Sequence, residues 1–360
     1  MSQIIANSAT VKQRDQRLDI LKGIGIILMV VGHSGFPYAN YIYLFHMALF
    51  FMASGYVWND DKVRSVKAVG KATLSRVRSL WVPFAVGNGI FTLLNNWFVR
   101  FDLYSPTKNG MIDIRLTGKL FLRNLLFHGD TQFGGASWFL RTLLIISIAH
   151  ILIRYIVCKM RHGNVLFAAV VSLTVVMAGY INQTRWELPF GLHTCFAAYF
   201  AFLMGVFLKK VQLMDRIGKY CPIAAVASFA VLVILGKLDT VGMGAGNIGS
   251  LPFFLAVSLA GWIMVWGLAS VMKGWIGRWI STCGRMSIWI LMLHFLAFKP
   301  VSFVYLCYCG WDRSRLSEFP TLANTSAMLW IAYSIAGVIL PLIVGASVKW
   351  ITERIRSLKK

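Results

Sequence analysis

The residues of this sequence most suited to chemistry are ionisable side chains inside long apolar stretches. The first stretch carries Asp19, Lys22 and His33, and the second carries His46. Lys22 and His33 are 11 residues apart, so on a helix they share one face at a separation of roughly 16 Å along the axis. Asp19 lies one turn before Lys22 and can pair with it. A buried imidazole that faces a hydroxyl group suits a general base, and in a transporter it suits a proton relay.

The elements that must position these side chains are membrane helices. A short connection, 37–40, joins the first two stretches, which therefore run in opposite directions. His33 and His46 then fall at a similar depth, where their imidazoles can lie close together. Further ionisable residues fall in the middle or the outer half of later stretches: Arg141, His193, His294 and Lys299. Each alone is typical of an interhelix hydrogen bond, whereas together they predict a polar chamber near the outer surface.

The composition points to a membrane protein. Of the 360 residues, 58% are hydrophobic and 14% are charged, whereas a soluble domain carries about 45–50% and about 25%. This excludes an ordinary soluble enzyme, a disordered chain, a coiled coil and a disulfide scaffold. Windows of about 20 apolar residues predict an all-α protein with about ten transmembrane helices. They cover 18–37, 41–58, 81–99, 138–157, 165–181, 190–208, 221–237, 251–272, 287–309 and 324–348.

The basic residues orient these helices. Of the 36 Lys and Arg residues, 23 fall on the side of the two termini and nine on the opposite side. Cytoplasmic loops carry the excess of basic residues, so both termini are predicted to be cytoplasmic. The net charge of +23 follows from the same bias, and no nucleic-acid partner is expected. We expect one membrane domain over residues 1–360, with short tails 1–17 and 349–360 and no appended soluble domain. The six cysteines lack a zinc-like spacing, so no metal site is expected.

The predicted cytoplasmic segment 59–80 is strongly basic, and it allows two interpretations. One is an amphipathic helix that lies on anionic lipid. The other is a docking surface for a polyanion such as a nucleotide phosphate. In the second case Arg76 and Arg78 are the better candidates, because they lie closest to the next span.

Five sequence motifs follow one another along the chain. They are RLDILKGIGIILMVVGH (17–33), YLFHMALFFMASGY (43–56), SRVRSLWVPF (75–84), ASWFLRTLL (136–144) and CGRMSIWILMLHF (283–295). Their content and order resemble the membrane-bound acyltransferase 3 family, in particular its fucose 4-O-acetylase-like and O-antigen O-acetyltransferase branch. In that family a basic residue, ten intervening residues and a histidine mark the first span. Lys22 and His33 match that pattern.

The resemblance implies a ten-span enzyme of the bacterial inner membrane. It would move an acetyl group from cytoplasmic acetyl-CoA, a co-substrate and not a bound cofactor, to a hydroxyl of a lipid-linked or surface glycan such as an O-antigen or exopolysaccharide. His33 would be the general base, with His46 as its catalytic partner. Lys22, Arg76 and Arg78 would bind the acyl-CoA. The expected supporting residues are Asp19, Ser54, Trp138, Arg141 and His294. The alternative is a glycan or glycolipid transporter or flippase that uses intramembrane His and Lys residues.

Overall fold

The described chain is built from helices alone. The computed structural model describes residues 15–127 and 131–358, so most of the predicted tail 1–17 and the last two residues of the tail 349–360 lie outside the described residues. No strand forms within the described ranges. The predicted all-helical membrane fold is therefore confirmed. Seven of the described helical segments are long and apolar enough to cross a membrane.

The seven long segments correspond to the predicted spans from the fourth to the tenth. Their main helices are α9 (Trp138–Lys159), α10 (Gly163–Thr184), α11 (Leu192–Lys210), α13 (Cys221–Leu235), α14 (Leu251–Val271), α16 (Ser287–Cys309) and α17 (Leu329–Leu358). Shorter helices join them: α12 (Leu213–Ile217), α15 (Gly274–Arg285), and the single turns η3 (Gly135–Ser137), η4 (Pro189–Gly191), η5 (Gly218–Tyr220), η6 (Met243–Ala245) and η7 (Arg313–Ser317).

The first two predicted spans form shorter helices than expected. α1 (Gln16–His33) ends at His33, four residues before the predicted boundary. The second span is broken into α2 (Ala39–Tyr43) and α3 (His46–Tyr56), because Phe45 has φ −138° and ψ −23°. The ring Nδ1 of His46 lies 3.0 Å from the Ile42 carbonyl. In a continuous helix that carbonyl would accept the backbone N–H of residue 46, so the side chain replaces the helical bond.

The third predicted span also changes shape. η1 (Asp60–Val63) is followed, after a short break, by α4 (Val66–Arg76). α4, the π turn η2 (Val77–Trp81) and α5 (Val82–Leu93) then run on without a gap. The basic segment 59–80 is thus mostly helix and continues directly into the third span. α6 (Asn95–Arg100), α7 (Pro106–Asn109) and α8 (Ile114–Leu125) follow, so the stretch between the third and fourth predicted spans is partly helical.

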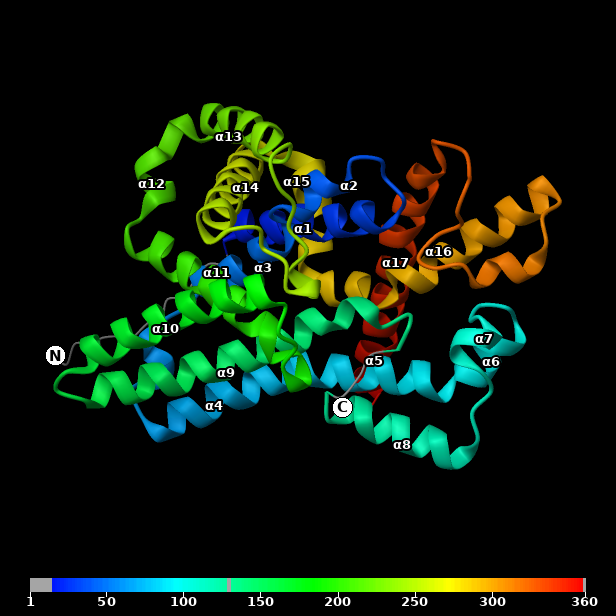
Figure 1. The fold of residues 1–360 in the computed structure, drawn as a ribbon, viewed down its shortest axis with the longest axis horizontal. Coiled ribbons are helices and arrows are strands. Elements are labelled where there is room, and N and C mark those ends of the chain that lie inside the picture. Colours follow the sequence, from blue (N-terminus) through cyan, green and yellow to red (C-terminus); the bar gives the residue numbers. More distant parts are fainter. Residues whose placement is uncertain (1–14, 128–130, 359–360) are drawn as a thin grey trace, which may run out of the picture.

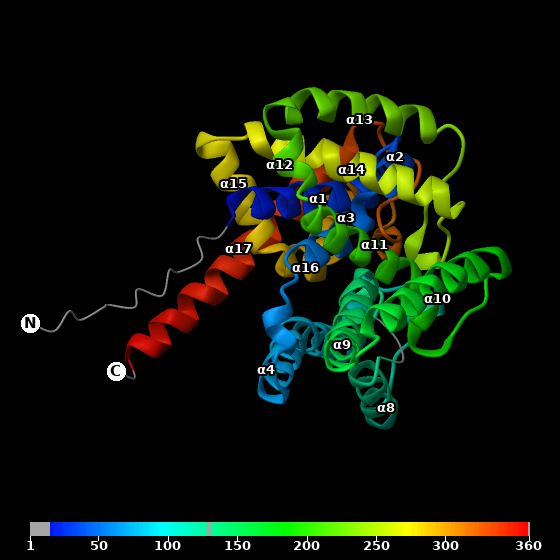
Figure 2. The ribbon, with the colours of Figure 1, turned by 90° about the vertical axis from the view of Figure 1, so that its left-hand side faces the viewer.

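Helix α1 lies in the middle of the bundle. It contacts α2, α3, α14, α15, α16 and α17. Figures 1 and 2 show α13 and α14 on one side of α1 and α3, and α4, α9 and α10 on the other. α1 begins and α17 ends at the same end of the bundle (Figure 2). The last turns of α17 project beyond the neighbouring helices.

Two glycines let α3 and α11 pack with their backbones in contact. A Cβ atom at Gly55 would overlap the carbonyl of Phe202, and one at Gly205 would overlap the carbonyl of Met52. Small residues at such positions allow membrane helices to approach closely. This contact holds α3, and with it His46, against the rest of the bundle.

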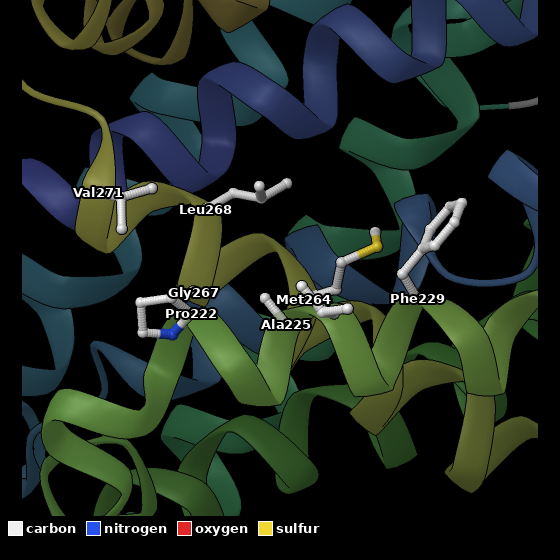
Figure 3. A pocket seen from close by; sticks show the side chains of 8 residues that line it. Pro222, Ala225, Phe229, Met264, Gly267, Leu268 and Val271 are labelled. Atoms are coloured by element: carbon white, nitrogen blue, oxygen red, sulfur yellow. The ribbon is translucent and has the colours of Figure 1, made fainter.

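Two apolar grooves lie along α13 and α14. The first, of about 370 Å³, is lined by residues of these two helices, including Pro222, Gly267 and Val271 (Figure 3). The second, of about 680 Å³, extends to Val31 of α1. Both are lined by Phe229 and Met264, so they adjoin one another. The larger groove is lined mainly by aromatic and aliphatic side chains.

Candidate active site

Three imidazoles gather around the end of α1. His33 is the last residue of α1, His46 is the first of α3, and His294 lies within α16. The rings of His33 and His294 stack with centroids 5.5 Å apart. The ring of Tyr43, at the end of α2, lies 5.9 Å from that of His33 and 5.3 Å from that of His46. Phe295 packs against His33, with ring centroids 5.1 Å apart.

Hydrogen bonds fix the tautomers of the three rings. Nδ1 of His46 lies 3.0 Å from the Ile42 carbonyl, and Nδ1 of His294 lies 3.1 and 3.0 Å from two carbonyls of its own helix. A carbonyl only accepts, so each Nδ1 carries the proton in the neutral ring. The Tyr43 hydroxyl donates to the Gly32 carbonyl at 2.6 Å, and its oxygen lies 3.4 Å from Nδ1 of His33. By the same reasoning Nδ1 of His33 donates to Tyr43, which leaves its Nε2 as the basic nitrogen.

The three histidines differ in exposure. His46 is 3% exposed and His294 is fully buried, whereas His33 is only half-buried. Within the described ranges Nε2 of His294 has no hydrogen-bond partner. His33 is therefore the imidazole of the group that a substrate reaches most easily. His46 and His294 lie deeper in the protein than His33.

A narrow apolar cavity lies beside the histidines. Its volume is about 40 Å³, and it is enclosed by α1, α3, α9 and α16. Met29 is one turn before His33, Met47 follows His46, and Leu291 is almost one turn before His294. The cavity therefore lies on the side of the histidines that faces the start of α1.

A second, basic cavity lies where α4 meets α9, two helices that run side by side in Figure 1. Its volume is about 380 Å³, and Lys62, Lys71 and Arg76 line it together with Asp61 and Ile151. The Asp61 carboxylate pairs with Arg64 outside the lining, at 2.6 Å. Arg78 is exposed, and it and Lys22 are not among the lining residues.

An ion pair beside the basic cavity holds η1 against α9. Asp60 in η1 accepts hydrogen bonds from Arg154 of α9 at 2.8 and 3.1 Å and from the indole of Trp58 at 2.9 Å. Burial alone would raise the pKa of Asp60, but these hydrogen bonds outweigh it and hold the pKa below its usual value. Asp60 thus stays ionised and ties η1 to α9.

The structure places the other sequence-predicted residues away from the three rings or gives them structural partners. Asp19 is buried and Lys22 half-buried in the first turns of α1. Trp138 packs against Gly244, in the loop between α13 and α14. Arg141 lies under Gly191 and donates to the Phe127 carbonyl at 3.3 Å.

Two further ionisable residues of the expected chamber make loop contacts. His193 lies 3.3 Å from the amide of Leu188. Lys299 donates to the carbonyls of Leu316 and Glu318 at 2.8 and 2.6 Å. Lys299 therefore fastens the loop after α16, as an interhelix hydrogen-bond partner does.

Sequence reasoning overlooked three residues near these cavities. Tyr43 lies in one of the motifs, but its contact with His33 depends on the break between α2 and α3. Ser147 and His150 lie in α9; the Ser147 hydroxyl and Nε2 of His150 are buried and have no hydrogen-bond partner in the described parts of the chain. His150 sits inside a predicted span, and that signal alone would have singled it out.

The described residues contain no group of three or more His, Cys, Asp or Glu side chains arranged to hold a metal ion. Imidazoles whose Nδ1 protons are oriented in this way suit acid–base chemistry. Their Nδ1 atoms are held by oxygen acceptors, and the accessible nitrogen of His33 is suited to take a proton from a hydroxyl.

Comparisons with known proteins identify the family of this chain. A sequence profile of an acyltransferase domain matches residues 15–346, which is nearly the whole chain. The chain is also similar to nodulation protein NolL of Sinorhizobium fredii (strain NBRC 101917 / NGR234), with 27% identity over 205 residues, 51% of this chain and 48% of the relative. The match thus spans about half the length of that curated relative. No solved structure matches the chain. Its long apolar helices are those of a multi-pass membrane protein. The extent of the domain match shows that this chain belongs to the acyltransferase 3 family.

Proposed function

We propose that this protein transfers an acetyl group from cytoplasmic acetyl-CoA to a hydroxyl of a cell-surface glycan, with His33 as the general base. The observation that carries the proposal is the environment of His33. Its ring is half-buried at the end of the central helix, its Nδ1 faces the Tyr43 hydroxyl, and an apolar cavity adjoins it. A general base needs an accessible, oriented nitrogen of this kind.

The donor enters from the cytoplasmic side in this proposal. The basic cavity between α4 and α9 has the charge and the volume to receive the phosphates of a nucleotide. We assign the phosphates to Arg76, Lys62 and Lys71, which line it, and not to Arg78 or Lys22. The acetyl thioester would then reach the apolar cavity beside His33.

The reaction follows from the basic nitrogen of His33. Nε2 takes the proton of the acceptor hydroxyl while the oxygen attacks the thioester carbonyl. The carbon–sulfur bond breaks, and the proton on His33 passes to the departing CoA thiolate. An acetyl-His33 intermediate would need the same nitrogen and the same two substrates. In either form the stacked His294 ring and Tyr43 hold the His33 ring in place.

The acceptor approaches from the opposite side. The apolar groove of about 680 Å³ includes Val31, two residues before His33, and Ile42, whose carbonyl faces His46. Its aromatic and aliphatic lining suits the hydrocarbon part of a lipid-linked glycan. With both termini in the cytoplasm, as the excess of basic residues on that side favours, the enzyme would lie in the bacterial inner membrane with its glycan site outward.

The test is mass spectrometry of the surface polysaccharide from cells with the gene, without it, and with His33→Ala at matched membrane levels. Loss of one acetyl mass per repeat in both the deletion and the variant is the expected result, and it would identify the sugar. Unchanged acetylation with altered glycan export would instead favour a transporter. Acetylation that persists in the His33→Ala strain but not in the deletion would refute His33 as the base.

A further inference from the structure

One face of helix α9 borders both cavities of the candidate active site. Leu140 lines the apolar cavity beside the histidines, and Ile151 lines the basic cavity. Leu140, Ser147 and Ile151 follow the spacing i, i+7, i+11, so they share a single helical face. At 1.5 Å per residue, the two cavities lie roughly 16 Å apart along the helix. Ser147 stands between them.

Helix α3 presents a matching face. Met47 and Phe50 line the apolar cavity, and Ser54 lies seven residues after Met47 on the same side of the helix. Two ring contacts tie α3 to α9. Phe51 meets Phe139 with centroids 5.0 Å apart, and Trp58, two residues beyond α3, meets His150 at 4.4 Å. Ser54 and Ser147 lie between these two contacts.

The hydroxyls of these two serines are buried without a partner. Ser54 is 8% and Ser147 is 2% exposed, and neither oxygen makes a hydrogen bond within residues 15–127 and 131–358. A buried polar group that lacks a partner is unusual and costs stability. Thr142, on the same helix α9, shows the ordinary situation, since its hydroxyl lies 2.9 Å from that of Thr194.

We propose that the facing sides of α3 and α9 form the track of the acyl-donor arm, and that the Ser54 and Ser147 hydroxyls hydrogen-bond its amide groups. This inference rests on the proposed use of acetyl-CoA. The pantetheine arm carries two amides between the phosphate and the sulfur. At the advance per bond of an extended chain it spans roughly 15 Å, close to the separation of the two cavities. Inside a membrane protein those amides need hydrogen-bond partners.

The chemistry of the arm explains why small hydroxyl side chains occupy these positions. A serine leaves room between two helices and both donates and accepts hydrogen bonds. The phosphates stay in the basic cavity with Arg76, the amides pass Ser147 and Ser54, and the thioester reaches the histidines. Nε2 of His150, also buried without a partner, lies at the cytoplasmic end of the track.

The experiment measures binding by isothermal titration calorimetry on the full-length protein in lipid nanodiscs. The probes are coenzyme A, which has the arm, and adenosine 3′,5′-bisphosphate, which has the nucleotide phosphates but no arm. Ser54→Ala and Ser147→Ala should each weaken coenzyme A binding by roughly 5-fold, the effect of one hydrogen bond, and leave the bisphosphate unchanged. Ser147→Leu, which fills the track, should abolish coenzyme A binding but keep that of the bisphosphate.

The matched control is Ser258→Ala on α14, because the Ser258 hydroxyl is also buried without a partner in the described residues. It should bind both probes as the unchanged protein does. Wild-type coenzyme A affinity in both serine variants would overturn the track, and so would equal weakening of both probes. If the unchanged protein binds neither probe, the proposed donor is wrong, and the track is refuted with it.

Discussion

Replacing Tyr43 by Phe tests whether His33 is held in place by a specific contact. The change removes one hydroxyl and keeps the ring that packs between His33 and His46. Two interactions are lost. The bond to Nδ1 of His33, at 3.4 Å, is long and is worth about 1 kcal/mol at most. The bond to the Gly32 carbonyl, at 2.6 Å, is short, and its loss leaves a buried carbonyl at the end of α1 unpaired.

These two losses set the size of the effect. A loosened His33 ring lowers kcat by roughly 5-fold if only the longer bond matters. Movement of the end of α1 could raise the loss to roughly 50-fold, since an unpaired buried carbonyl costs about 1–3 kcal/mol. Removal of the proposed base in His33→Ala should cost about 10²- to 10⁴-fold. Tyr43→Phe should therefore fall clearly between the unchanged enzyme and His33→Ala.

The assay follows radiolabelled acetyl transfer from acetyl-CoA to the glycan fraction of membrane vesicles, at saturating donor. KM for acetyl-CoA should stay constant, because Tyr43 lines neither the basic nor the apolar cavity. Tyr180→Phe on α10 is the matched control, since Tyr180 is 50% exposed and packs against Trp186. An unchanged kcat in Tyr43→Phe would refute the positioning role. A loss as large as that in His33→Ala would show that Tyr43 takes part in the proton transfer itself.

Three further predictions concern the basic cavity, the helix packing and the loop between α16 and α17. Arg76→Ala should raise KM for acetyl-CoA about 10-fold, as expected for a phosphate contact, whereas Arg78→Ala should leave it within about 2-fold; steady-state kinetics of both variants checks this. Gly55→Val should prevent α3 from packing against a backbone carbonyl of α11 and abolish the monodisperse peak in size-exclusion chromatography. Burial alone would raise the pKa of Glu318, but hydrogen bonds from Arg315 and a backbone amide outweigh it and hold the pKa below its usual value. Its stabilising effect is therefore present above the ordinary glutamate pKa and lost as pH falls through the lowered one, so thermal melting of Glu318→Gln should lose less stability on acidification than that of the unchanged protein.

The later spans of the fold were predictable because hydropathy measures what defines them. Seven windows from 138 onward are long and apolar, and each corresponds to one described helix. The earlier windows failed in detail for two reasons. α1 carries charged residues in its first turns, and the second span breaks at Phe45, where the His46 side chain takes the carbonyl that a helix would use. A sliding average of hydropathy cannot show that a side chain and a backbone amide compete for the Ile42 carbonyl.

The candidate site was partly readable from span register. Counting residues from the span ends put His33 and His46 at one depth and His294 near mid-span. In the structure His33 and His46 both lie against Tyr43, and His294 stacks on His33. The sequence also allowed the prediction that Arg76 and Arg78 do not both line one cavity, since side chains two residues apart on a helix point to different sides. The proposed track between α3 and α9 could not be predicted, because a single sequence does not show which helices are neighbours.

In the proposed reaction, the apolar cavity would let acyl transfer outcompete hydrolysis of the donor. A thioester that waits beside a base reacts with water unless water is kept away. The cavity of about 40 Å³ is lined mainly by residues such as Met29, Met47 and Phe139 and holds little beyond an acetyl group. His46 and His294 have their Nδ1 atoms bonded to carbonyls, so their N–H groups do not hold water there. In the proposed reaction the glycan hydroxyl approaches His33 from the other side. His33 then activates this hydroxyl in preference to water.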